Sequence, residues 1–329
     1  MKIAIVGCGA LGSYYGAALL GAGAEVHFLL RSDLAVVRRE GVRILTAEGE
    51  IRRHPQTAAT PEEIGVCDLV VIALKTTAND QFRVLLPPLI GPATRLLTLQ
   101  NGLGNEAALA AQFGAERVLG GLCFVCLNRI APGVIHHLAH GLIVLGEFGR
   151  PATPATHDLA ALFRRGGIPC RVTENLAAAH WEKLVWNIPF NGLGVAGAAG
   201  YPALEAGRVD PAAPLIPCLA TDALLGDARW EAAVRALMHE VLAAAQALGL
   251  PLDAGIAENQ ITRTREMGRY LASTLLDFQN GRPLELESLF REPWRQAQAA
   301  GVPTPWLTRL CGVLGDLDSR RLPAGGASS

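Results

Sequence analysis

Three polar side chains recur at helical spacing in the segment 175–195. Lys183, Asn187 and Asn191 are four residues apart, so a helix places them on one face. Two amides and an ammonium on an otherwise apolar face are costly to bury without partners. The face therefore suits a polar, anionic substrate, to which a lysine could donate a proton. The spacing alone leaves a solvent-facing stripe as the alternative, and Pro189 predicts a kink or an early end of this helix.

A glycine-rich motif lies near the amino terminus, between a strand predicted at residues 3–6 and a helix predicted at 10–20. The motif reads Gly7-Cys8-Gly9-Ala10-Leu11-Gly12. Gly7 permits a tight turn, Gly9 lets a pyrophosphate approach the backbone, and Gly12 lets the helix pack against the strand. The start of the helix offers N–H donors to the phosphates. We therefore predict that these six residues bind a dinucleotide, with an ordinary glycine-rich turn as the alternative.

The residues after the second predicted strand, 25–30, indicate which dinucleotide is bound. An acidic residue at this place ordinarily binds the ribose hydroxyls of NAD. Here Arg31 stands there instead, and a guanidinium suits the 2′-phosphate of NADP(H). Two alternatives stay open: Asp33 could face the ribose if the strand ends later, and Arg31 could be an ordinary surface side chain.

Two further polar residues follow predicted strands at 69–74 and 95–99. Doubly wound sheets bind ligands at the carboxyl ends of their strands. Lys75 could meet a cofactor phosphate or a substrate carboxylate, and Asn101 could bind the nicotinamide ribose or amide. An Asn-Gly pair at a strand end is also a common turn.

The elements that must position these residues fall into two groups. Alternating strands and helices up to residue 173 predict an α/β domain with a Rossmann-type, doubly wound sheet. The unbroken apolar run 69–74 indicates a parallel sheet covered on both faces. The mainly α-helical remainder, 174–321, is expected to serve the substrate and a homodimer contact, before a disordered tail at 322–329. Further strands are predicted at 117–126 and 142–145, further helices at 228–248, 254–265, 284–300 and 305–317, and a loop at 197–213.

Composition excludes several classes of function. Half of the 329 residues are hydrophobic, and 29 Lys and Arg side chains balance 30 Asp and Glu side chains. This balance argues against nucleic acid as the main partner. The apolar runs are too short to span a bilayer, and no secretory signal is evident, so we expect a cytoplasmic protein without membrane contact.

Cysteine and lysine usage add two points. The seven cysteines are interpreted as reduced thiols, because only Cys123 and Cys126 are closely spaced. No second CxxC follows, so no metal site is expected; a redox pair is the minor alternative, because this run is typical of a strand. Only Lys2, Lys75 and Lys183 are lysines, and arginine replaces an ammonium poorly as a proton donor.

Taken in chain order, these motifs resemble those of ketopantoate reductases (2-dehydropantoate 2-reductases). The glycine motif, Arg31, Lys75, the turn at 100–102 and the Lys183 face occur in that family's order, and segment 273–287 resembles its second signature. The resemblance spans roughly residues 1–310. It implies an NADPH-dependent oxidoreductase that reduces a small 2-oxo acid, ketopantoate, to pantoate in pantothenate biosynthesis.

The resemblance also implies roles for single residues. Lys183 would be the general acid, Asn187 and Asn191 would hold substrate oxygens, and Ser273 would bind the substrate carboxylate or hydroxyl. Glu285 matches the acidic residue near the nicotinamide ribose, with a surface residue at a helix start as the alternative.

The chain departs from the family pattern after Asn191. The stretch 192–220 is longer and richer in Ala, Gly and Pro than expected, and Tyr201 stands where many members have asparagine. A reductase or dehydrogenase for another branched 2-oxo or 2-hydroxy acid is therefore an open alternative. A third reading, a non-catalytic NADPH-binding regulatory protein, is disfavoured by Lys183, because a sensor needs no proton donor.

Overall fold

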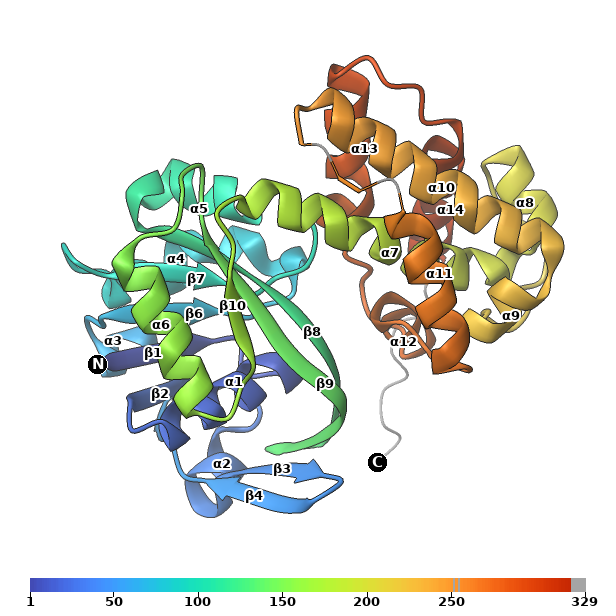
Figure 1. Cartoon of the computed structure of the whole chain (residues 1–329). Helices are drawn as coiled ribbons and strands as arrows, with labels where there is room; N and C mark the ends of the chain where they lie inside the picture. Colours follow the sequence, from blue (N-terminus) through green and yellow to red (C-terminus); the bar gives the residue numbers. More distant parts are fainter. Residues whose placement is uncertain (251, 254, 321–329) are drawn as a thin grey trace. The chain divides into compact units, whose positions relative to one another are not determined.

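Figure 1 shows the computed structural model of the chain, which describes residues 1–250, 252–253 and 255–320. The chain divides into two compact units, Met1–Ala179 and the residues from His180 onward. The predicted tail at 322–329 lies outside the described residues. Each unit is described by itself below.

The first unit is built on a mixed sheet whose centre is parallel, as the apolar runs predict. Six strands lie there in the order β5-β2-β1-β6-β7-β8, and each pairs with its neighbours in parallel. All four residues of β6 are buried, which accounts for its apolar run without alternation. The bounds are β1 Lys2–Val6, β2 Glu25–Leu29, β5 Gln56–Ala58, β6 Leu69–Ile72, β7 Arg95–Thr98 and β8 Val118–Ala131.

The strands beyond the parallel centre, at the β8 end of the sheet, are built on a long hairpin that the sequence predicted only in part. β8 continues beyond the predicted end at residue 126 and pairs antiparallel with β9, Val134–Glu147. The predictions were too short because the far half of the hairpin is partly exposed and its residues are not continuously apolar. Three short strands complete this side: β3 Val42–Thr46, β4 Gly49–Arg53 and β10 Cys170–Val172.

Helices cover both faces of this sheet, which confirms the predicted doubly wound class (Figure 1). Ile3 and Ile5 pack in one apolar cluster with α1 and α6, whereas Ala4 and Val6 pack in a second with α3, α4 and α5. Alternate residues of a strand point to opposite faces, so β1 contributes to the core on both. The helices are α1 Ala10–Gly21, α2 Leu34–Glu40, α3 Pro61–Ile64, α4 Phe82–Leu85, α5 Asn105–Phe113 and α6 Pro154–Arg165.

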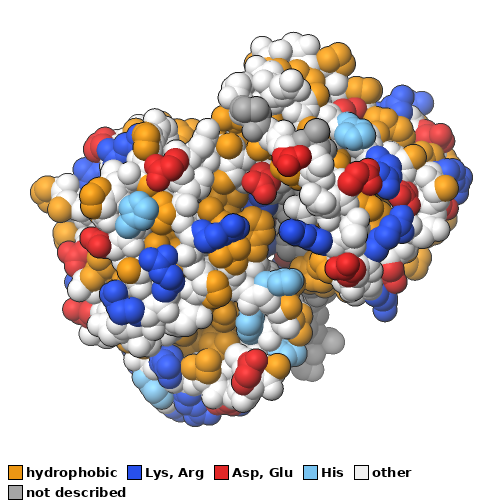
Figure 2. All heavy atoms as spheres, in the orientation of Figure 1, with side chains coloured by type: hydrophobic (Ala, Val, Ile, Leu, Met, Phe, Trp, Pro, Cys, Tyr) orange, Lys and Arg blue, Asp and Glu red, His pale blue; other side chains and the backbone are white. Residues whose placement is uncertain are grey.

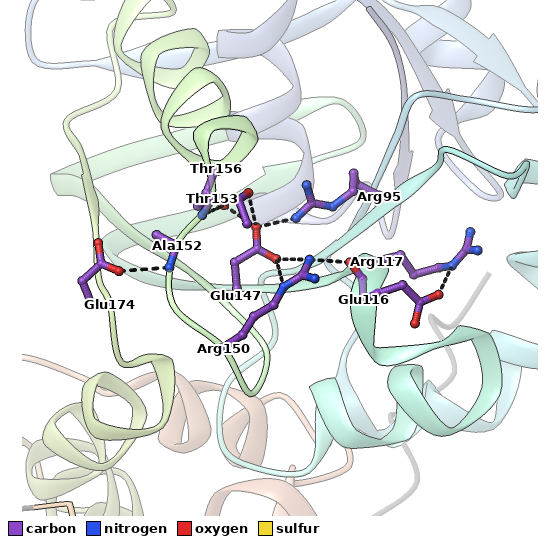
Figure 3. Close-up of polar contacts among 9 residues, drawn as sticks. All are labelled: Arg95, Glu116, Arg117, Glu147, Arg150, Ala152, Thr153, Thr156 and Glu174. Atoms are coloured by element: carbon purple, nitrogen blue, oxygen red, sulfur yellow. Dashed lines mark hydrogen bonds and ion pairs between the residues drawn. The ribbon is translucent and has the colours of Figure 1, made fainter.

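One buried carboxylate joins three of these elements, as Figure 3 shows. The side chain of Glu147, at the end of β9, is fully buried. It accepts hydrogen bonds from Arg95 of β7 (2.6 Å) and from Arg150 (3.0 Å). The hydroxyls of Thr153 and Thr156, at the start of α6, also donate to it. The contacts fix β7, β9 and α6 to one another.

Helices are the only regular secondary structure among the described residues of the second unit. Its long helix α10 buries one apolar face, including Leu237 and Val241. Glu240 of the same helix accepts the backbone N–H groups of Trp306 and Leu307 and so caps α14. The helices are α7 Leu176–Ala196, which begins in the first unit, α8 Tyr201–Ala206, α9 Thr221–Gly226, α10 Ala228–Ala247, α11 Ile256–Met267, α12 Ser273–Gln279, α13 Glu292–Ala299 and α14 Pro305–Ser319.

Two expectations about this unit were wrong, and one of the two alternatives given for Pro189, an early end of the helix, does not hold. The stretch 197–213 is not all loop, because α8 begins with Pro202 in its first turn and ends at the left-handed Gly207. The helix expected at 284–300 starts later, with a π-helical turn at Glu287–Arg291 that leads into α13. Pro189 does not end α7, which continues to Ala196 between buried apolar neighbours.

Two surface properties complete the description. On the face drawn in Figure 2, acidic and basic side chains are interspersed on both units. Among the described residues, no helix combines the length and the apolar character needed to cross a membrane.

Candidate active site

The glycine motif forms the turn between β1 and α1, and its three glycines meet different surroundings. Gly7 has φ +100°, and a Cβ there would lie 2.4 Å from the backbone nitrogen of Leu74. A Cβ on Gly12 would lie 2.3 Å from the Gly7 carbonyl oxygen. In contrast, a Cβ on Gly9 would meet no other described atom within 4 Å. The first and third glycines are thus required by close packing, while the second faces open space at the start of α1.

The other three residues of the motif contribute backbone rather than reactive side chains. Ala10 and Leu11 pack against the core. The Cys8 thiol donates to the carbonyl of Ile5 (3.4 Å). Burial raises the pKa of this thiol well above its ordinary value, so it stays protonated at neutral pH.

Arg31 and Asp33, the two residues that bear on cofactor choice, differ sharply in exposure. Arg31 is exposed two residues after the end of β2. Asp33 is buried, and its carboxylate accepts hydrogen bonds from Arg129 of β8 (3.0 Å to Nε) and the backbone N–H of Gly133 (3.0 Å). Burial acts to raise the pKa of Asp33, but these hydrogen bonds outweigh it and hold the pKa below its ordinary value.

Lys75 and Asn101 follow β6 and β7, as predicted, and a chain of side-chain amides links the two segments. Lys75 is exposed. The side-chain nitrogen of Gln100 donates to the side-chain oxygen of Asn79 (2.7 Å). The side-chain nitrogen of Asn79 in turn donates to the side-chain oxygen of Asn105 (2.9 Å). Asn105, which is fully buried, in turn donates to the backbone oxygen of Asn101 (3.0 Å). These hydrogen bonds hold the turn that carries Asn101 in place.

All of these predicted cofactor residues lie at the carboxyl ends of four adjacent strands. In the order β7-β6-β1-β2, the next strand along the sheet's central chain path, β2, pairs on one side of β1. The later strands β6 and β7 lie on the other side of β1. Such a reversal of strand order is where open α/β sheets bind ligands. The first unit therefore brings together the glycine motif, Arg31, Lys75 and Asn101 at one edge.

The second unit brings together the polar residues of α7 and the start of α12. Lys183 is half-buried, and only 8 % of Asn187 and 2 % of Asn191 are exposed, so the solvent-facing alternative is wrong for both amides. The Asn191 side-chain oxygen accepts hydrogen bonds from the Ser273 hydroxyl (3.3 Å) and the Thr274 backbone N–H (3.0 Å). Two residues more than 80 positions apart in sequence are thus in direct contact.

Glu285 lies between α12 and the π-helical turn. It is 6 % exposed, so the alternative of a surface residue at a helix start is wrong. Single π-helical turns are frequent at functional sites, because they displace side chains from their regular helical positions.

Sequence reasoning missed Asn79, Asn105 and Thr274. Asn105 could have been found, because it stands four residues after Asn101 at the start of a helix. Asn79 and Thr274 act through contacts with residues 26 and 83 positions away, for which local spacing holds no signal.

Comparison with known proteins finds one family whose models match both parts of this chain. Residues 3–150 match the family model described as Ketopantoate reductase PanE/ApbA, and residues 203–318 match the model of its C-terminal part. A 2-dehydropantoate 2-reductase of Nostoc sp. is 37% identical, over 97% of this chain and 96% of its own length.

Solved structures agree with this match. A crystal structure of 2-dehydropantoate 2-reductase from Geobacter metallireducens has 41% identity and a TM-score of 0.86, covering 97% of this chain and 99% of its own. A D-mandelate dehydrogenase, solved with NADH and anilino(oxo)acetate, shares the fold at 21% identity with a TM-score of 0.82, covering 97% and 99%.

A glycine motif at the switch point of a doubly wound sheet, followed by a helical unit, defines a class of two-domain oxidoreductases. Within that class, this chain belongs to the ketopantoate reductase PanE/ApbA family, as the sequence motifs predicted.

Proposed function

We propose that this protein reduces ketopantoate (2-dehydropantoate) to pantoate, with NADPH as the hydride donor and Lys183 as the general acid. The observation that carries the proposal is the polar face of α7. It combines a half-buried lysine with two buried amides, one of them held by Ser273 and Thr274. Such a set suits a small, polar anion, because buried polar groups need partners.

We assign cofactor binding to a domain of residues 1–173, and the residues present fit NADPH. The open space at Gly9 leaves room for a pyrophosphate beside the N–H groups at the start of α1. Exposed Arg31 suits a 2′-phosphate, whereas the Asp33 carboxylate is already engaged by Arg129 and Gly133. Lys75, Asn101 and Glu285 are assigned to the cofactor as well.

Residues 174–321 would supply the acid and the substrate contacts. NADPH, when bound, supplies a hydride to the carbonyl carbon of the 2-oxo acid. The carbonyl oxygen gains negative charge during that transfer, and the Lys183 ammonium stabilises it and donates the proton from Nζ. Asn187 and Asn191 hold substrate oxygens, and Ser273 binds the carboxylate or hydroxyl.

The contacts of Asn191 define how its amide is used. A backbone N–H can only donate, so the Asn191 atom bonded to the Thr274 N–H is the amide oxygen. The amide nitrogen is therefore directed elsewhere, and we assign it as a donor to a substrate oxygen. A 2-oxo acid offers acceptor oxygens to such a donor.

A second candidate is the reduction of a different 2-oxo acid, or the reverse oxidation. The D-mandelate dehydrogenase that shares the fold was solved with anilino(oxo)acetate. In this chain the stretch 192–220, which departs from the family pattern, contains α8. The first residue of that helix is Tyr201, at a position where many family members have asparagine.

A panel of 2-oxo acids, assayed by the loss of NADPH absorbance, tests the proposal. We expect ketopantoate to have the highest kcat/KM, and simple aldehydes to be poor because they leave the carboxylate partners unpaired. A better branched or aromatic 2-oxo acid would favour the second candidate. An aldehyde that outperforms every 2-oxo acid would contradict the substrate site, and NADPH binding without any turnover would favour a regulatory protein.

A further inference from the structure

Asp33 stands at the residue before α2 but does not cap that helix. An aspartate at this position ordinarily accepts a backbone N–H from the first turn. No such side-chain hydrogen bond is present at Asp33. Its carboxylate instead points to Arg129 on β8 and Gly133 in the turn between β8 and β9, which are 96 and 100 positions away.

The acceptor capacity of this carboxylate is filled. Oδ2 accepts from Arg129 Nε (3.0 Å) and the Gly133 N–H (3.0 Å), while Oδ1 accepts from Arg129 Nη2 and the Ser32 hydroxyl (2.9 Å). A carboxylate has about four lone-pair sites, and four donors occupy them here. A ribose hydroxyl could therefore bind Asp33 only by displacing one of these donors.

The ion pair is also asymmetric in its exposure to solvent. The Asp33 side chain is 7 % exposed and the Arg129 side chain is 35 % exposed. A bidentate guanidinium pair on a buried carboxylate is stronger and better oriented than an ordinary surface pair. It also neutralises a negative charge only two residues from Arg31.

We propose that Arg129 sets the cofactor preference as a positioning residue, by occupying and neutralising Asp33. With Arg129 present, the net charge of Arg31, Asp33 and Arg129 is positive, which favours a 2′-phosphate. Without Arg129, the charges of Arg31 and Asp33 sum to zero. The oxygens of the Asp33 carboxylate can then accept hydrogen bonds from ribose hydroxyls. The inference rests on the proposed use of NADPH, and it adds a residue that acts on the preference through Asp33.

The test is the ratio of NADPH to NADH dissociation constants, measured by fluorescence titration of the reduced nucleotides. Arg129→Leu should lower the preference for NADPH by roughly 10-fold, mainly through weaker NADPH binding. Asp33→Asn in the Arg129→Leu background should restore most of the preference, because the uncompensated charge is gone. Arg129→Lys should retain most of it.

Two further variants separate this role from general effects. Arg38→Leu removes an exposed arginine from α2, one that bonds Thr57 rather than Asp33, and should leave the ratio within about 2-fold of the wild type. Asp33→Asn alone should raise the preference for NADPH by several-fold, a result that does not depend on the stability of the Arg129→Leu variant.

An unchanged ratio in Arg129→Leu, or no restoration in the double variant, would overturn the inference. If Arg31→Ala abolishes the preference while Arg129→Leu leaves it intact, only this role for Arg129 fails. Equal affinities for both nucleotides in the wild-type protein would overturn the NADPH proposal and this role together.

Discussion

Lys183 is the residue on which the proposed chemistry depends most. Of the other two lysines, Lys2 donates to the carbonyl of Ile64 and serves the fold. Lys183→Ala should lower kcat by about 10²- to 10⁴-fold, the usual contribution of a general acid. Lys183→Arg should also be poor, because a guanidinium keeps its proton. Steady-state rates measure this, with thermal melting and NADPH titration as checks on folding and binding.

The neighbouring Glu182 provides the control for that experiment. It is exposed on the same helix, one position away from the polar face. Glu182→Gln should leave kcat within about 2-fold, because exposed substitutions rarely affect buried sites. A near-normal kcat for Lys183→Ala would make Lys183 a structural residue.

Arg31 carries the direct part of the cofactor preference. Arg31→Ala should weaken NADPH binding by roughly 10- to 100-fold, as the loss of one charge-assisted phosphate contact would give. NADH lacks the 2′-phosphate, so its affinity should hardly change. Titration with both nucleotides measures the effect, and an equal loss for both would show that Arg31 supports the fold of the loop instead.

At the scale of residues, local spacing predicts neighbours on one element and fails for partners on distant ones. The four-residue spacing correctly grouped Asn187 and Asn191, which are both buried. It could not show that Arg129 holds Asp33, because 96 positions separate them. The sequence alone therefore could not decide whether Asp33 faces the cofactor ribose.

At the scale of elements, apolar runs located the central strands because those strands are buried on both faces. β6 illustrates this, since all of its residues are buried. β4 was missed because it is almost fully exposed and carries charged residues, so its sequence has no apolar signal. The hairpin of β8 and β9 was underestimated for a related reason, because its far half is partly exposed.

The Glu147 cluster that joins β7, β9 and α6 predicts a pH-dependent stability. Burial acts to raise the pKa of Glu147, but hydrogen bonds from Thr156, Arg95 and Arg150 outweigh it and hold the pKa below its ordinary value of 4.5. A carboxylate of this kind stabilises the fold above its unfolded-state pKa. Its contribution is lost as the pH falls through the folded-state pKa.

Glu147→Gln should therefore lower the free energy of unfolding at pH 7 by about 1–3 kcal/mol, because the partly buried Arg95 and the exposed Arg150 lose their charge partner. The difference from the wild type should shrink below about pH 4. Denaturant titrations at several pH values measure both effects.

Glu174→Gln is the matched control for this cluster. Glu174 is exposed and accepts a single backbone N–H from Ala152 (3.0 Å) in the same region (Figure 3). It should change the free energy of unfolding by less than about 0.5 kcal/mol. An equal, pH-independent loss in both variants would contradict the assigned role of Glu147.

At the scale of the whole molecule, the alternation of strands and helices was enough to predict the α/β class and the helical remainder. The order of the strands was not accessible, because pairing depends on contacts between distant segments. The choice among 2-oxo acids was not accessible from the sequence for a similar reason. It depends on the surroundings of α7, including the stretch with α8, whose helix was itself not predicted.

The pairing of β3 with β9 has a consequence for how the chain folds as it is synthesised. Arg43 of β3 lies opposite Val134 of β9, about 90 positions later. At roughly 5–20 residues per second, the ribosome needs on the order of 5 to 20 s to make that partner. For this interval the nascent hairpin of β3 and β4 has an open inner edge. The charged side chains of Arg43, Glu50 and Arg52, which pair on this hairpin, would discourage association between neighbouring nascent chains.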